Sequence, residues 1–302
     1  MILPKIVEQL GTDEFAFSGN PACQGCGALL SLRHILKALG KNTILIVPAG
    51  CTSIIAGLGK KATFNIPYMH MAFAASAAAA SGVSRAFKVL GKEDINVVVW
   101  AGDGSTFDIG FGTLSGAAER NEDIIYVCND NEAYMNTGIQ KSGATPTGAW
   151  TTTTVKGRVG YKKDLFRIML DHRVPYVATA SPAYPMDLAR KVKYAASLKG
   201  FRLIHVLNPC PPGWRFDHKL TVEIAKKSVL SGAWILMEAE YGKIKLNPPS
   251  STMLEERKIP VRDYLLMQGR FRHLTEDKIM EIQKIIDENW RVIKHILISQ
   301  KE

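Results

Sequence analysis

Cysteine is scarce in this sequence, with five among 302 residues. That number is too small for a disulfide framework, so any clustered cysteines point to metal or redox chemistry in a reducing compartment. Long apolar runs are also absent, since none reaches the roughly 18 to 20 uncharged residues of a membrane helix. The first residues lack the charged, then apolar, pattern of a signal peptide. We expect a cytoplasmic protein without a membrane span.

Acidic residues are fewer than basic ones, 28 against 38, which leaves a formal net charge of +10. Such a charge suits phosphate-bearing ligands, an acidic protein or nucleic acid, and says nothing about the fold. The cations are scattered, and no zinc finger, helix-turn-helix or RNA-binding signature accompanies them. A basic surface or an acidic partner is therefore favoured, and no nucleic-acid partner is predicted.

Short Val- and Ile-rich runs alternate with amphipathic or Ala-rich stretches, the pattern of a parallel sheet covered by helices on both faces. Strands are predicted at residues 43–47, 95–100, 124–128, 176–178 and 202–207. Helices are predicted at residues 28–39, 51–58, 72–90, 110–120, 163–172 and 185–198. The sequence thus predicts a doubly wound, mostly parallel α/β fold.

The last third of the chain differs in character. Residues 234–246 suggest a hairpin or edge segment, and residues 276–298 a long amphipathic helix. We expect one α/β domain over residues 1–232 and a C-terminal helical extension over residues 233–302. This extension would pack on the same domain or on a partner subunit.

Four of the cysteines occupy positions that a parallel sheet would bring together. Cys23 and Cys26 form a C-x-x-C pair, while Cys51 and Cys210 each follow a predicted strand. Loops at the carboxyl ends of parallel strands converge on one edge. Four thiolates bind either zinc or a [4Fe–4S] cluster, and one close pair plus two distant cysteines, the last followed by Pro, favours the cluster. Cys128 lies inside a predicted strand, where we expect a buried apolar role.

A second set of polar residues follows two other predicted strands. Gly102-Asp103-Gly104 comes after one strand, and Asn131 follows the next after 26 intervening residues. Carboxylate and amide oxygens suit Mg²⁺, whose remaining positions suit diphosphate oxygens. A simple turn is the alternative for Gly-Asp-Gly alone, but both halves sit at strand ends. A dinucleotide motif is excluded because the glycines of residues 110–116 have the wrong spacing.

These motifs resemble those of a known family. Gly-Asp-Gly followed after 26 residues by Asn is similar to the diphosphate–Mg²⁺ signature of thiamine diphosphate enzymes. Residues 21–27 (PACQGCG) and 130–153 (DNEAYMNTGIQKSGATPTGAWTTT) resemble the β subunit of pyruvate and related 2-oxoacid:ferredoxin oxidoreductases. The resemblance extends over most of the chain and implies the diphosphate-binding type of thiamine diphosphate fold.

The resemblance also implies roles for individual residues. The [4Fe–4S] ligands would be Cys23, Cys26, Cys51 and Cys210. Mg²⁺ would be bound by Asp103, the Asn131 side chain and the Ala133 carbonyl. Asn136 would face the thiazolium and substrate as the catalytic residue of this chain. The remaining cofactor-binding residues would be Gly25, Gly27, Gly102, Gly104, Thr137 and Gly138.

Two further residues invite a catalytic interpretation. His70 and Glu132 are both ionisable and lie close to these motifs. For each of them a buried or hydrogen-bonded structural role is expected instead.

By this resemblance the chain belongs to an enzyme of the EC 1.2.7 type, inactive without its partners. Expected partners are α-, γ- and δ-type subunits, ferredoxin, a 2-oxoacid and coenzyme A. The expected reaction is oxidative decarboxylation of pyruvate on thiamine diphosphate, with electrons passing through the [4Fe–4S] cluster to ferredoxin. Alternatives are a family member specific for oxalate or another 2-oxoacid, a non-redox thiamine diphosphate decarboxylase or synthase, and a non-catalytic metal-stabilised electron-transfer module.

Overall fold

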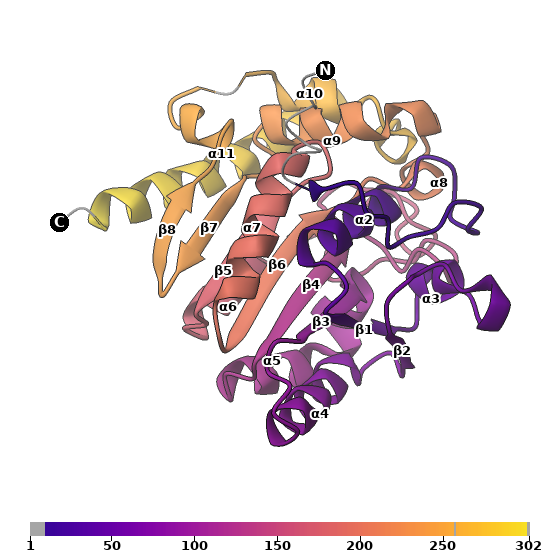
Figure 1. The fold of residues 1–302 in the computed structure, drawn as a ribbon. Coiled ribbons are helices and arrows are strands. Elements are labelled where there is room, and N and C mark those ends of the chain that lie inside the picture. Colours follow the sequence, from indigo (N-terminus) through magenta and orange to yellow (C-terminus); the bar gives the residue numbers. More distant parts are fainter. Residues whose placement is uncertain (1–9, 257, 301–302) are drawn as a thin grey trace, which may run out of the picture.

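The computed structural model describes residues 10–256 and 258–300. Its centre is an eight-stranded sheet in the order β2-β1-β3-β4-β6-β5-β7-β8 (Figure 1). The first six strands run parallel and the last two antiparallel. The strands are β1 Thr43–Pro48, β2 Tyr68–Met71, β3 Asn96–Gly102, β4 Ile124–Asp130, β5 Tyr176–Ala180, β6 Phe201–Leu207, β7 Met237–Glu240 and β8 Lys243–Leu246. The predicted α/β fold is confirmed.

Helices cover both faces of this sheet, as Figure 1 shows. On one face lie α2 Gly27–Leu39 and α7 Pro185–Ser197, which contact each other. The other face carries α4 Ser76–Val89, α5 Phe111–Glu119, α6 Leu165–Asp171 and α11 Glu276–Ser299. Each face has its own apolar core, because the central strands are buried on both sides.

Register aligns the strand ends that matter for function. Gly102 of β3 lies opposite Asn129 of β4, and Asp130 of β4 lies opposite Leu207 of β6. The chain leaves these three neighbouring strands at the same edge. Residues immediately after β3, β4 and β6 are therefore brought together, whatever their distance in sequence.

The C-terminal segment is continuous with the sheet. Strand β7 pairs antiparallel with β5, and β8 completes a hairpin at the sheet edge. Helix α11 contributes Ile286 and Ile293 to the larger core. The predicted hairpin and long helix are thus present, and both share the sheet and core of the preceding residues.

Some elements lack a clear sequence signal. Strand β2 is short and partly exposed, while α9 Thr221–Leu230 and α10 Val261–Leu265 were not predicted. Helix α4 begins at Ser76 rather than residue 72, because Ala72–Ala75 form a hydrogen-bonded turn. Among the described residues, no helix is long and apolar enough to cross a membrane.

Candidate functional site

A cavity of about 300 Å³ opens at the carboxyl edge of the sheet. Its walls come from the segments after β1, β3 and β4, and include Cys51, Asp103, Asn131, Ala133 and Asn136. Two of the predicted residue sets, one from the cysteines and one from the oxygen ligands, therefore border the same space.

Two oxygens and the Asn131 amide converge in this cavity. One end of the amide lies 3.2 Å from Asp103 Oδ1 and 2.8 Å from the Ala133 carbonyl oxygen, and with its N–H group there it donates to both. With its oxygen there it would face only acceptors, as it would around a bound cation. Adjacent oxygens of an octahedron with metal–oxygen bonds of about 2.1 Å are separated by about 3.0 Å. The geometry therefore suits a small divalent cation in one amide orientation and a neutral hydrogen-bonded arrangement in the other.

The charge of Asp103 is poorly compensated by the chain. The carboxyl group is buried, and Ser142 Oγ donates to its Oδ2. Burial, followed by the nearby Asp130 carboxylate, raises the pKa of Asp103. No cation in the described part of the chain forms an ion pair with it. A bound divalent cation would stabilise its ionised form.

Asp130, just before the metal-ligand candidates, has the opposite environment. Its Oδ2 accepts from Lys162 Nζ and from His205 Nε2, and its Oδ1 accepts from the Glu132 amide. Burial alone would raise the pKa of Asp130, but Lys162 and His205 outweigh burial and lower it. This carboxylate is therefore ionised and fully occupied by the chain.

Glu132 is a structural residue of the same loop, as predicted. Its carboxylate accepts from Lys162 Nζ at 2.9 Å and from Arg270 Nη2 at 2.6 Å. Its backbone adopts a φ of +65°, a strained conformation for a residue with a side chain. The two ion pairs hold that conformation, in which Asn131 and Ala133 present their oxygens to the cavity.

His70 does not fit its prediction. Its side chain is exposed on β2, with its ring against Tyr68 at a centroid distance of 5.5 Å. The expectation of a buried or hydrogen-bonded role is wrong, because β2 is a short edge strand whose side chains are only partly covered.

Three of the four candidate cluster cysteines lie at helix N-termini. Cys26 caps α2, and its Sγ accepts from the Leu29 amide; Cys51 begins α3 Cys51–Ala56; Cys210 precedes α8 Pro211–Trp214. Cys23 is joined to Cys26 by a backbone hydrogen bond of 3.1 Å. Free amides at helix N-termini favour thiolates and the sulfurs of bound anionic groups.

The four thiols lie close enough to influence one another. Burial, followed by Cys51, Cys26 and Cys23, raises the pKa of Cys210 to about 12. Burial, followed by Cys26, Cys23 and Asp103, raises the pKa of Cys51 to about 11. These thiols are thus protonated in the bare chain, and metal binding would release their protons. Cys128, by contrast, is buried in β4 as predicted.

The spacing of these groups bears on the choice of metal. Within residues 10–256 and 258–300, no three Cys, His, Asp or Glu side chains are arranged to hold a single metal ion. Tetrahedral zinc with bonds of about 2.3 Å requires sulfurs about 3.8 Å apart. An iron–sulfur cube is larger, since each thiolate binds a different iron. The four cysteines are thus neighbours, and no three of them have the spacing of a mononuclear site.

The glycines predicted to bind the cofactor differ in the space that surrounds them. A Cβ on Gly25 would lie 2.3 Å from the His218 carbonyl oxygen, and one on Gly27 would lie 2.7 Å from the Pro209 carbonyl oxygen. Both therefore serve close contacts within the chain. A Cβ on Gly104 would meet the Tyr134 ring at 2.4 Å, whereas one on Gly102 would meet nothing within 4 Å.

The segment predicted to face the thiazolium and diphosphate lies on the open side of the cavity. Asn136 and Thr137 line it, and together with Gly138 they are exposed. Thr137 Oγ1 donates to Gln140 Oε1 at 2.6 Å, and Gly138 has a φ of +121°. Their exposure leaves these residues available to a ligand or a second chain.

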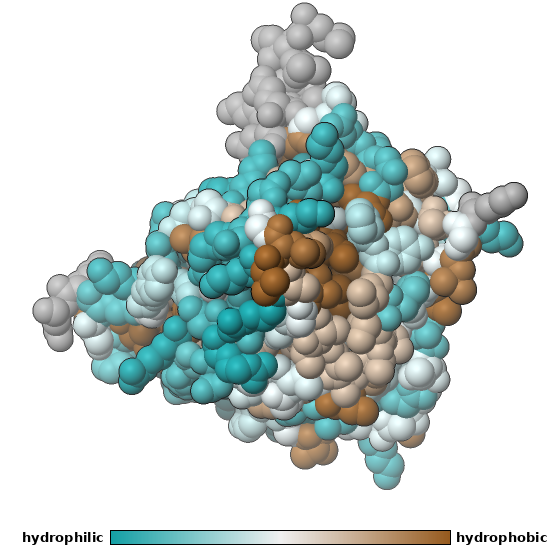
Figure 2. All heavy atoms as spheres, turned by 60° about the horizontal axis from the view of Figure 1, so that its bottom comes forward, coloured by the Kyte–Doolittle hydropathy of each residue, from teal (hydrophilic) through white to brown (hydrophobic). Residues whose placement is uncertain are grey.

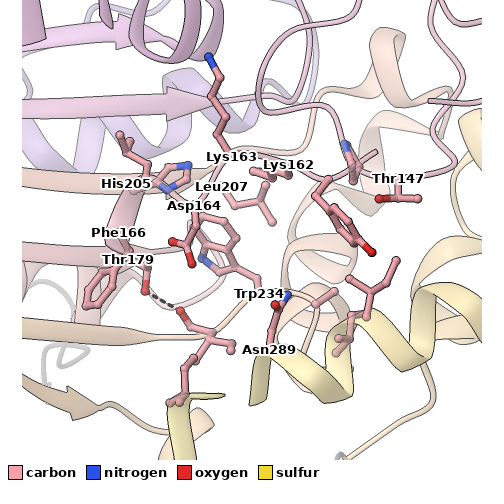
Figure 3. A pocket seen from close by; sticks show the side chains of 18 of the residues that line it. Thr147, Lys162, Lys163, Asp164, Phe166, Thr179, His205, Leu207, Trp234 and Asn289 are labelled. Carbon is pink, nitrogen blue, oxygen red and sulfur yellow. Dashed lines mark hydrogen bonds between the residues drawn. The ribbon is translucent and has the colours of Figure 1, made fainter. Parts of the chain in front are cut away.

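A second cavity, of about 350 Å³, is bordered by Glu132. Residues 130–133, which contain the candidate metal ligands, are called the metal-ligand loop below. The lining of this cavity is mostly apolar; α11 contributes seven of the lining residues, and others come from α6, α10 and residues 161–164. Figure 3 shows Lys162, His205 and Trp234 on its wall, with Asn289 contributed by α11. Lys162 Nζ lies 5.2 Å from the Trp234 ring centre. Part of this cavity's polar wall is therefore the network that holds Asp130 and Glu132.

Four residues of this region were missed from the sequence: Lys162, His205, Trp214 and Arg270. Lys162 is one of the scattered cations, which suggested only a basic surface. The other three occur in no recognisable motif, although His205 does lie on a predicted strand at the same edge as Asp130. Only that strand position offered a signal.

Comparisons with known proteins identify relatives of this chain. Residues 48–206 match the family model described as thiamine pyrophosphate enzyme, C-terminal TPP binding domain. The chain is 47% identical over 280 residues to pyruvate synthase subunit PorB of Methanothermobacter thermautotrophicus, covering 91% of this chain and 96% of that protein. It is 45% identical over 294 residues to ketoisovalerate oxidoreductase subunit VorB of Pyrococcus abyssi, covering 94% of each.

A solved structure has the same fold. The 2-oxoglutarate:ferredoxin oxidoreductase from Magnetococcus marinus aligns with a TM-score of 0.57 at 25% identity, over 70% of this chain and 79% of that one. The matched family model, the long alignments and the shared fold agree with one another. This chain belongs to the thiamine diphosphate enzymes, as the β subunit of a 2-oxoacid:ferredoxin oxidoreductase.

Proposed function

We propose that this chain holds both thiamine diphosphate–Mg²⁺ and a [4Fe–4S] cluster, and that its complex oxidatively decarboxylates pyruvate with coenzyme A and ferredoxin. The observation that carries the proposal is the single cavity that is bordered by Cys51 on one wall and by Asp103, Asn131 and Ala133 on another. A non-redox thiamine enzyme has no need of the cysteines, and a metal-stabilised module has no need of the oxygens.

The oxygen set would hold the diphosphate end of the cofactor through Mg²⁺. Asp103 supplies the charge, while Asn131 and Ala133 supply neutral oxygens. Thr137 and Gly138 would line the diphosphate, and the open space at Gly102 leaves room for it. Asn136, exposed at the rim, would orient the substrate. Thiamine diphosphate supplies the carbon–carbon cleavage chemistry when bound.

The cysteine set would hold the electron acceptor beside that cofactor. Cys23, Cys26, Cys51 and Cys210 provide four thiolates, three of them at helix N-termini. The effect of Asp103 on the pKa of Cys51 indicates that the two sites are neighbours. Electrons from the substrate would then have a short path to the cluster and onward to ferredoxin.

Exposed residues support the proposal that partner subunits complete the site. Figure 2 shows an apolar area beside a hydrophilic one on the face turned up from the bottom of Figure 1, where α4 lies. Helix α4 exposes Ala78, Gly82 and Ala86 at intervals of one turn, which suits close packing of another helix. We propose α-, γ- and δ-type subunits as partners. The glutamate that activates the thiamine would come from one of them.

The identity of the 2-oxoacid substrate is a separate part of the proposal. One relative is named for pyruvate and another for ketoisovalerate at nearly equal identity. We propose pyruvate as the substrate, with branched 2-oxoacids as the competing outcome.

The test is anaerobic purification of the native complex, followed by iron, sulfide, zinc and thiamine diphosphate assays. We expect about four irons for this chain's cluster and bound thiamine diphosphate. The matched variants are Cys210→Ala, which should lose this cluster, and Cys128→Ala, which should keep it because Cys128 is buried in β4. Zinc without thiamine diphosphate would overturn the proposal. Ferredoxin reduction with a panel of 2-oxoacids then identifies the substrate.

A further inference from the structure

Arg270 is a buried cation that comes from the C-terminal segment rather than from either motif. It lies in the turn η5 Gly269–Phe271, which contacts α8 immediately after Cys210 (Figure 1). Its side chain is 3% exposed. A guanidinium buried to this degree must be fully paired, so its partners are structurally important.

One partner of Arg270 is the metal-ligand loop. Its Nη2 donates to Glu132 Oε2 at 2.6 Å, between the two candidate ligands Asn131 and Ala133. Its Nε donates to Gln268 Oε1 at 2.9 Å, which fixes the plane of the guanidinium. The ion pair thereby restrains Glu132, whose positive φ sets the direction of the neighbouring oxygens.

The other partner is the turn that carries Cys210. The Arg270 guanidinium carbon lies 3.7 Å from the centre of the Trp214 ring, a stacked arrangement. The Trp214 amide donates to the Cys210 carbonyl oxygen at 2.8 Å. The Trp214 indole N–H donates to the Asn131 carbonyl oxygen at 2.8 Å. Trp214 and Arg270 therefore join the cysteine turn to the metal-ligand loop by two routes.

We infer that Arg270 is a positioning residue that fixes the metal-ligand loop relative to the Cys210 turn, and so sets the placement of the two cofactors. The inference rests on the proposed function, since it concerns where that function's cofactors would be held. Arg270 touches neither site directly. It acts through Glu132 on one side and through Trp214 on the other.

The chain offers a matched control. The Arg215 guanidinium carbon lies 3.5 Å from the Trp150 ring centre, in a similar stack one residue beyond Trp214. Arg215 is exposed, however, and the partners of Glu132 are Lys162 and Arg270. Removing Arg215 thus removes a stacked guanidinium near the same turn and leaves the link to the metal-ligand loop intact.

The experiment compares Arg270→Met, Arg270→Lys and Arg215→Met in the purified complex. Two quantities are measured: the dissociation constant of thiamine diphosphate with Mg²⁺ after cofactor removal, and the rate of iron loss to a chelator. For Arg270→Met we expect a dissociation constant higher by about 10- to 100-fold, as for other residues that support metal ligands, and faster iron loss. Arg270→Lys should partly restore cofactor affinity, because it keeps the charge opposite Glu132. Arg215→Met should match the wild type in both.

Other outcomes separate this inference from the function it rests on. If the wild-type complex lacks iron or thiamine diphosphate, the proposed function fails. If it holds both, and Arg270→Met lowers thermal stability while leaving cofactor affinity and iron loss unchanged, the role is merely structural and the inference is overturned. Should Arg270→Met not fold, hydrogen exchange of the wild-type complex decides. Cofactor binding should then protect residues 210–216 and 268–271, and no protection there would contradict the inference.

Discussion

The loop after β4 has two sides with opposite electrostatics. Toward the cavity, the Asn131 amide lies beside Asp103 Oδ1 and the Ala133 carbonyl oxygen. Away from it, Asp130 and Glu132 are hydrogen-bonded by cations of the chain. Asp130 and Glu132 thus form ion pairs within the described part of the chain, whereas Asp103 forms none there.

This difference indicates which carboxylate is available to a cationic ligand. Lys162 and Arg270 together balance Asp130 and Glu132. Asp103 is the third buried carboxylate of this region, and its pKa is raised, mainly by burial. Ionising a buried carboxylate is expensive unless a cation accompanies it. The three carboxylates lie in the same region, so the ion-pair partners of each one, rather than its position, distinguish Asp103 from Asp130 and Glu132.

The largest expected effect comes from removing the charge on the cavity side. Asp103→Asn should weaken thiamine diphosphate–Mg²⁺ binding by about 100-fold or more, because a ligand is lost rather than a supporting residue. The same change should raise the thermal stability of the metal-free complex. The pKa of Asp103 is raised, so its ionised form destabilises the folded chain at neutral pH. Calorimetric titration and thermal unfolding in chelator measure the two effects, and a lower unfolding temperature in chelator would contradict this explanation.

Lys162 lies on the other side of the loop, and its removal should lower the stability of the fold. Lys162→Met leaves Asp130 and Glu132 with too little positive charge and should destabilise the protein by about 3–5 kcal/mol. The matched control is Lys163→Met, which removes a half-exposed ion pair with Asp108 and should cost at most about 1 kcal/mol. Denaturant unfolding followed by tryptophan fluorescence gives both values. Equal losses for the two lysines would remove the distinction between the two sides of the loop.

Two neighbouring glycines sharpen the comparison on the cavity side. Gly104→Ala should destabilise the fold by about 1–3 kcal/mol, since its Cβ would lie 2.4 Å from the Tyr134 ring. Gly102→Ala meets nothing within 4 Å and should leave stability nearly unchanged. Its methyl group would enter the cavity, so cofactor affinity should fall instead. Thermal unfolding and cofactor titration of both variants measure the two effects. A Gly104→Ala variant as stable as the wild type would contradict the prediction.

A last comparison concerns Glu238, a buried carboxylate on β7 that lies outside this loop. Burial would raise its pKa, but hydrogen bonds from Arg190, Tyr176 and Asn247 lower it from 4.5 to about 2. A depressed pKa gives stability that is complete above about pH 4.5 and lost as pH falls toward 2. Glu238→Gln should therefore cost about 1–3 kcal/mol at pH 7, and the difference should shrink between pH 4.5 and 2. A pH-independent difference would show that shape, rather than charge, matters here.

The fold and the metal-ligand candidates were predictable because periodicity and strand-end position are local signals. Asp103 and Asn131 each follow an apolar strand, so the sheet itself brings them together. Arg270 could not be predicted in the same way. It meets Glu132 across 138 residues from a single turn of 3₁₀ helix that no sequence pattern marks. Strand β2 escaped prediction because four partly exposed residues carry no alternation.

The glycines illustrate a subtler limit. Gly25 lies within the Cys23–Cys26 motif and Gly27 directly follows it, which suggested room for a cofactor. In the structure the space beside them is filled by the backbone at His218 and Pro209. Sequence patterns indicate that a small residue is needed, whereas only the fold tells which neighbour requires it.

The amide of Asn131 bears on how the proposed cation would be received. One orientation of this side chain donates to Asp103 and Ala133, and the other would offer an oxygen alongside theirs. The two orientations differ by a half-turn of a single amide. A cation bound at these oxygens would therefore require only that half-turn, and the backbone of the loop could stay as it is.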